Sequence, residues 1–135
     1  MLALILSLAA LAGSHLATPD IKAADILRRL DLNSFPNSTG PRKVAGWKYP
    51  SDWSFTELIE EGGSATLARP GDWSISLWVI RQTADGAVVC FLDRAHNGGT
   101  YSTRTALRVV GDAKAGYRAV ERVQDATCEP LPGHG

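Results

Sequence analysis

Six segments in which apolar and polar residues tend to alternate, each ended by a turn, constrain the fold of this chain more than any other feature. The segments are Phe55–Glu60, Ala65–Arg69, Trp73–Gln82, Ala87–Asp93, Tyr101–Val110 and Tyr117–Val123. Glycine, proline, Asp and Asn residues fill the short gaps between them, as in Pro70-Gly71-Asp72 and Asn97-Gly98-Gly99. Consecutive strands joined by short turns pair in antiparallel fashion. The pattern therefore predicts a meander sheet of five to six antiparallel strands.

An amphipathic helix is predicted before the strands. Thr18-Pro19-Asp20 has the composition of a helix start, with a hydroxyl cap, a proline at the first helical position and an acid in the first turn. Apolar residues then recur at i, i+3, i+4 and i+7, in Ala23, Ile26, Leu27 and Leu30. This spacing predicts a helix of about three turns. A sheet with one buried face needs such a cover, so we expect an α+β fold with the helix packed on the meander.

The first 17 residues contain no Lys, Arg, Asp or Glu, and most of them are Leu, Ala and Ile. The apolar run is shorter than the about 20 residues of a membrane-spanning helix and is typical of an export signal. Small residues place the cleavage after Ala12 or after Ala17. We therefore expect a signal peptide over 1–17, a single α+β domain over 18–135, a secreted or periplasmic location, and no stable membrane span after signal removal. A buried N-terminal helix is the alternative.

The two cysteines, Cys90 and Cys128, are predicted to form a disulfide, because paired cysteines are usual in an oxidising compartment. This bond would tie the C-terminal tail to the sheet, whereas two free thiols are the alternative. Asn37-Ser38-Thr39 matches the N-glycosylation sequon, and its use depends on a secretory pathway that glycosylates it.

Trp47, Tyr49 and Trp53 form the first candidate binding surface. They lie in one short segment that also contains glycine and proline. Flat rings supply contact area at low entropic cost, as at sugar-binding and peptide-binding surfaces. The competing interpretation is that the rings close a loop over the core. Trp78, on the less apolar face of its predicted strand, is open to the same two interpretations.

Four arginines form the second candidate surface. Arg104 and Arg108 are predicted to share a face of one strand, and Arg118 and Arg122 to share a face of the next. Such a strip would recognise a carboxylate or a phosphate, although a solvated outer face with acids nearby explains the pattern equally. Basic and acidic residues balance at 14 each, so we expect no nucleic-acid partner.

Asp93 and His96 are the only ionisable residues that resemble a catalytic pair, with Asp93 orienting the imidazole. They are weak candidates, because no nucleophile accompanies them and a turn rich in Asp, Arg and Asn is ordinary turn chemistry. With His134 they have no recognised metal-ligand spacing, and no glycine loop precedes a helix, so we expect no metal and no cofactor.

These features favour a secreted or periplasmic, non-catalytic binding or inhibitor-type module. The sequence does not identify its partner, for which a protein and a glycan are both open. One alternative is a small hydrolase or isomerase that uses Asp93 and His96. The other is a structural component of the cell envelope.

Mass spectrometry of the protein purified from its native host tests the predicted leader. We expect a mature chain that begins at Gly13 or Thr18 and is recovered outside the cytoplasm, because an uncharged apolar leader directs export. Recovery of intact Met1 in the cytosolic fraction would contradict this prediction.

Overall fold

The computed structural model describes residues 21–36 and 40–129. The predicted leader, the predicted helix start at Thr18-Pro19-Asp20, the sequon at Asn37 and the terminal His134 lie outside these residues. Within them, no helix combines the length and the apolar character needed to cross a membrane.

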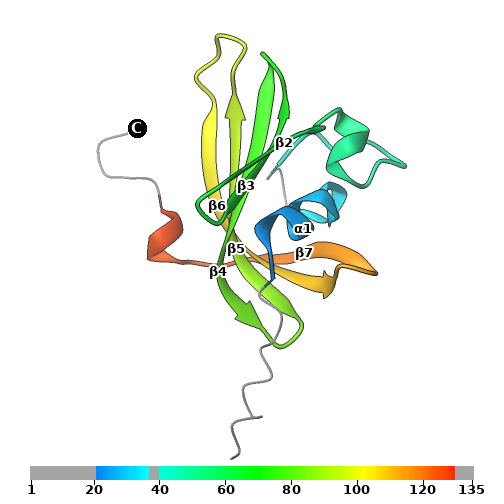
Figure 1. The fold of residues 1–135 in the computed structure, drawn as a ribbon, viewed down its shortest axis with the longest axis vertical. Helices are drawn as coiled ribbons and strands as arrows, with labels where there is room; N and C mark the ends of the chain where they lie inside the picture. Colours follow the sequence, from blue (N-terminus) through cyan, green and yellow to red (C-terminus); the bar gives the residue numbers. More distant parts are fainter. Residues whose placement is uncertain (1–20, 37–39, 130–135) are drawn as a thin grey trace, which may run out of the picture.

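A single seven-stranded sheet organises the described residues (Figure 1). The strands are β1 (Leu30–Asp31), β2 (Glu57–Glu61), β3 (Ser64–Arg69), β4 (Trp73–Thr83), β5 (Gly86–Ala95), β6 (Ser102–Asp112) and β7 (Gly116–Arg122). Strands β2 to β7 pair with their neighbours in chain order, as the meander predicts, and each pairing is antiparallel.

The expectation of a wholly antiparallel sheet of five to six strands is wrong in detail, because β1 adds a seventh, parallel strand beside β7. The helix is also shorter than predicted. Helix α1 (Ala23–Arg28) has six residues, fewer than two turns, where about three turns were expected, and Leu30 belongs to β1, opposite Tyr117. The apolar spacing nevertheless identifies buried residues, since Ile26, Leu27 and Leu30 are fully buried. The fold is mostly β, with one short helix.

The main core lies between the sheet and the N-terminal segment that crosses one of its faces. In β4 the odd-numbered residues supply this core, with Ile75 and Leu77 fully buried. Phe35 packs edge-on against Phe91 of β5, with ring centroids 4.8 Å apart. Figure 1 shows α1 in front of this face. The period-two pattern therefore assigned the core face of β4 correctly.

The C-terminal tail covers part of the opposite face. A short 3-10 turn, η4 (Ala126–Cys128), brings Cys128 against Cys90 of β5, and the two form the predicted disulfide, with Cα atoms 5.4 Å apart. Together with Ala106 these cysteines make a second small cluster, against which Trp78 packs half-buried. The guanidinium carbon of Arg104 lies 5.7 Å from the centre of the Trp78 ring. Of the two interpretations of Trp78, the structure favours a ring that is packed against the protein over an exposed binding surface.

Replacing Cys128 with Ser tests how far the disulfide stabilises this arrangement. The cysteines are 38 residues apart, so we expect the Cys128→Ser variant to lose about 4 kcal/mol of unfolding free energy on the chain-entropy model. Urea denaturation of the oxidised protein measures the loss. Ala126→Ser, in the same turn, is the control and should change little. Equal stability of both variants would contradict the prediction.

Candidate functional site

A pocket of about 400 Å³ opens at one end of the sheet. The turn between β3 and β4 and the loop between β5 and β6 meet there, because alternate turns of a meander lie at the same end. Four aromatic rings contribute to its wall, from Trp53, Phe55, Trp73 and Tyr101. We call this cavity the ring pocket.

The rings come from separate parts of the chain and are positioned by different contacts. Trp53 lies in the 3-10 turn η3 (Pro50–Trp53), and its indole N–H donates to the carbonyl of Arg42 at 2.9 Å. Trp73 begins β4, and its ring lies 5.4 Å from that of Tyr101, centre to centre. Tyr101 is 45% exposed, so its ring is available to a ligand.

Asp93 places a buried carboxylate in this aromatic wall. The residue lies on the core face of β5, opposite Ile75, and is only 2% exposed. The indole N–H of Trp73 donates a hydrogen bond to one carboxylate oxygen. Burial raises the pKa of Asp93 above its usual value, and this hydrogen bond opposes the rise only in part. No cationic side chain of the described residues forms an ion pair with Asp93.

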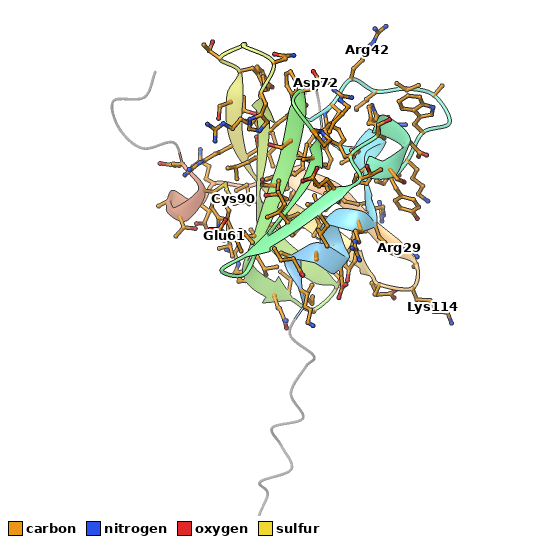
Figure 2. The ribbon with its side chains drawn as sticks, turned by 45° about the horizontal axis from the view of Figure 1, so that its top comes forward. Arg29, Arg42, Glu61, Asp72, Cys90 and Lys114 are labelled. Carbon is orange, nitrogen blue, oxygen red and sulfur yellow. A yellow bond between two sulfur atoms is a disulfide. The ribbon has the colours of Figure 1, made fainter. Side chains whose placement is uncertain are left out.

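The two arginines of the pocket are arranged differently from each other. Arg69 makes three contacts within the protein. Its Nε lies 2.5 Å from a carboxylate oxygen of Asp72, and its NH1 donates to the Trp53 carbonyl at 3.0 Å. Its guanidinium carbon lies 5.0 Å from the centre of the Phe55 ring. Arg42 is exposed and has no ion pair among the described residues. Figure 2 shows its side chain extending away from the ribbon, at the same end of the molecule as Asp72.

Asp72 also fixes the rim of the ring pocket. Its carbonyl accepts a hydrogen bond from the backbone N–H of His96 at 2.7 Å, and its carboxylate accepts one from the amide of Asn97 at 3.1 Å. Across the same loop, the N–H of Ala95 donates to the carbonyl of Tyr101 at 2.9 Å. The two loops at the rim are therefore tied together, which reduces the ordering that a ligand would have to impose.

The structure does not bring the predicted acid–base pair together. Asp93 lies on the core face, whereas the ring of His96 lies on the opposite face, where its Nε2 is 2.7 Å from the hydroxyl oxygen of Ser74. The expectation that Asp93 orients His96 is therefore wrong, because successive strand residues point to opposite faces. Ser74 is buried and His96 is exposed, and neither lines the ring pocket.

The predicted aromatic surface is divided between two places. Trp53 is buried and lines the ring pocket, and the exposed Trp47 packs edge-on against it, with ring centroids 5.3 Å apart. Tyr49 instead has two cations near its ring, the guanidinium carbon of Arg29 and the Nζ of Lys48, each 5.4 Å from the ring centre. The loop-closing interpretation holds for Trp53, while the binding role of the three rings stays a prediction.

The predicted arginine strip is broken by an irregularity between β6 and β7. The pairing skips Val120, so Arg118 lies opposite Val110 while Arg122 lies opposite the core residue Leu107. The extra residue interrupts the alternation between Arg118 and Arg122, and Arg122 lines a small pocket together with Arg104.

Two of the four arginines in this strip also have partners. Arg108 donates through Nε to Glu121 at 2.7 Å, and its NH1 lies 3.6 Å from Asp85. The hydrogen bond to Glu121 raises the pKa of Arg108. Arg104 lies over the Trp78 ring. The surface is thus closer to the alternative interpretation, a solvated face with acids nearby.

Sequence reasoning missed Phe55, Arg69, Trp73 and Tyr101 as pocket residues. A signal for two of them was present: Trp73 and Tyr101 each follow a glycine-containing turn, and both turns belong to the same end of the meander. The approach of η3 to this end had no such signal, because it depends on how a long irregular segment crosses the sheet.

Comparison with known proteins leaves the site to be interpreted from its chemistry, since no family model, curated protein or solved structure matches the chain. Among the described residues, no group of three or more His, Cys, Asp or Glu side chains is arranged to hold a metal ion.

The raised pKa of Asp93 predicts how its replacement changes stability. The folded protein binds the proton of Asp93 more tightly than the unfolded chain does, so stability falls as pH rises from the usual carboxyl pKa to the raised one. Above that window the charged carboxylate disfavours folding. We therefore expect Asp93→Asn, whose amide oxygen can still accept from Trp73, to raise the melting temperature at pH 7.

Thermal denaturation at pH 7 and pH 3 measures this effect. The advantage of the Asp93→Asn variant should shrink at pH 3, where the wild-type carboxyl is protonated as well. Asp85→Asn, at an exposed position, is the control and should show a smaller pH-dependent difference. A variant that is less stable than the wild type by the same amount at both pH values would contradict the interpretation.

Proposed function

We propose that this chain is an exported, non-catalytic binding module that takes its ligand into the ring pocket. One observation carries the proposal: aromatic rings surround a buried carboxylate, Asp93, that no ion pair of the described residues neutralises. The ligand is a small molecule or the end of a protein or glycan chain. The volume of about 400 Å³ lies in the range of small-ligand sites.

The energetics of Asp93 support binding over a purely structural role. A buried charge without a cationic partner costs stability, and an apolar side chain of similar size would avoid this cost. Strained or costly groups of this kind concentrate at functional sites. The hydrogen bonds of Asp72 across the rim give the pocket a defined shape before a ligand arrives.

Export is part of the proposal and has two supports. The first is the uncharged apolar leader over 1–17, which is typical of a signal peptide. The second is the disulfide between Cys90 and Cys128, a bond that persists mainly in oxidising compartments. A secreted or periplasmic protein would meet its ligand outside the cytoplasm.

A reaction is less well supported than binding. The hydrolase or isomerase alternative requires Asp93 and His96 to act on one substrate, and the sheet separates their side chains. The alternative of a structural envelope component does not account for the unneutralised Asp93.

Replacing Tyr101 with Ala tests the ring pocket as the binding site. Ligands are first identified by nuclear magnetic resonance screening of the mature protein against mixtures of sugars, amines, amino acids and short peptides. We expect Tyr101→Ala to weaken a hit by about 10- to 100-fold, because it removes one exposed ring of the wall.

Ile59→Ala is the matched control for this measurement. Ile59 is 47% exposed, against 45% for Tyr101, but it lies on the edge strand β2 and does not line the ring pocket. It should leave the affinity unchanged. Hits that bind the Tyr101→Ala variant and the wild type equally would refute the pocket as the site.

A further inference from the structure

We propose that the ring pocket binds an organic ammonium group, which donates a hydrogen bond to Asp93 while its carbon substituents lie against the aromatic rings. This inference rests on the proposed function and names the chemical class of its ligand. It follows from the charges in the wall, from the uncovered ring faces and from the carboxylate oxygen of Asp93 that accepts no hydrogen bond from the described residues.

The wall carries two arginines and one carboxylate, and the position of these charges, rather than their sum, favours a cation beside Asp93. Among the residues that the structure describes, Asp93 is the only acidic side chain that lines the ring pocket. Of the two arginines, Arg69 is paired with Asp72 at 2.5 Å, and Arg42 extends away from the ribbon (Figure 2). The buried carboxylate is therefore the charge that a ligand would compensate. A cation at this position would be attracted through a medium of low dielectric constant, where the interaction is strong.

The carboxylate also has room for a donor. Trp73 donates to one oxygen of Asp93, and the other oxygen has no hydrogen-bond donor among the described residues. An ionised carboxylate can accept several hydrogen bonds, so an ammonium N–H can bind there without displacing the indole. Hydrogen bonds between two charged groups are the stronger kind.

The rings offer faces to the same cation. One ring of the pocket, Phe55, is already covered by Arg69, just as Trp78 outside the pocket is covered by Arg104. No cation of the described residues lies over Trp73 or Tyr101. Tryptophan and tyrosine faces attract organic cations, and the attraction is stronger when water is excluded.

Other ligand classes fit the pocket less well. An anion would meet the negative charge of Asp93, while the half-buried Arg69 of the same wall already pairs with Asp72 and donates to the Trp53 carbonyl. A neutral sugar could donate a hydroxyl to Asp93 and stack on Tyr101, but it would leave the buried charge without a counter-charge. A neutral ligand is therefore an outcome of the test that would count against the proposal.

Binding should weaken on acidification, because protonation of Asp93 removes the charge that attracts the ligand. The charged and titratable groups around Asp93 are few: Arg69 on β3, Asp72 in the following turn, Arg42 on the rim and the phenol of Tyr101. Arg69 and Asp72 compensate each other's charge in their ion pair, so the buried carboxylate of Asp93 is expected to carry the dependence.

A titration with matched probes tests the inference. Benzylammonium and its neutral counterpart benzyl alcohol have nearly the same shape, and methyl glucoside represents a neutral sugar. The indole N–H signal of Trp73 in nuclear magnetic resonance spectra reports occupancy, since this group touches Asp93. At pH 7 we expect the affinity for benzylammonium to exceed that for benzyl alcohol by about tenfold or more.

Two variants decide which group provides this selectivity. Asp93→Asn should abolish the preference for benzylammonium, whereas Asp85→Asn, which removes the same charge from an exposed site outside the ring pocket, should keep it. Melting temperatures of both variants show that they are folded. Equal binding of the charged and the neutral probe, or an unchanged preference in Asp93→Asn, would overturn the ammonium assignment.

The same experiment separates this inference from the proposed function. If methyl glucoside binds in preference to benzylammonium and depends on Tyr101, the ring pocket is a binding site but the ammonium assignment is wrong. If no probe or screened ligand binds in a way that depends on Tyr101, both the ammonium assignment and the proposed function fail.

Discussion

The whole structure depends on covering both faces of one sheet with a short chain. On the larger face, α1 and Phe35 complete a core in which Ile75 and Leu77 lose all contact with solvent. On the smaller face the cover is the tail, which is held by a covalent bond at Cys128 where apolar contacts are few. Burial drives the first arrangement, and reduced chain entropy supports the second.

The ring pocket forms where the cover of the larger face ends. Trp53 and Phe55 approach the end of the sheet from the covering segment, while Trp73 and Asp93 belong to the sheet itself. Aromatic residues suit this boundary, since they bury a large area and still present a face or a polar edge to a ligand. A carboxylate at the same boundary is costly for folding, and its presence is explained more simply by recognition than by stability.

Features set by local pattern could be predicted from the sequence, and features set by long-range geometry could not. Period-two alternation found the strands and the core face of β4, and the two cysteines gave the disulfide. The same alternation missed the irregularity at Val120, because the skipped residue has no sequence signature. The helix pattern assigned Leu30 to a helix because a buried position looks the same in a helix and in a strand. The contact of Trp73 with Asp93 depends on strand register, which separate segments do not reveal.

The disulfide also determines how the molecule carries mechanical force. Residues 90–128, with all of β6 and β7, lie within a closed covalent ring, because Cys90 is in β5 and Cys128 follows β7. Tension applied at the C-terminus therefore passes from Cys128 directly to β5, a strand with hydrogen-bonded neighbours on both sides. This covalent path bypasses β6 and β7, so neither strand can be stretched out while the disulfide is intact.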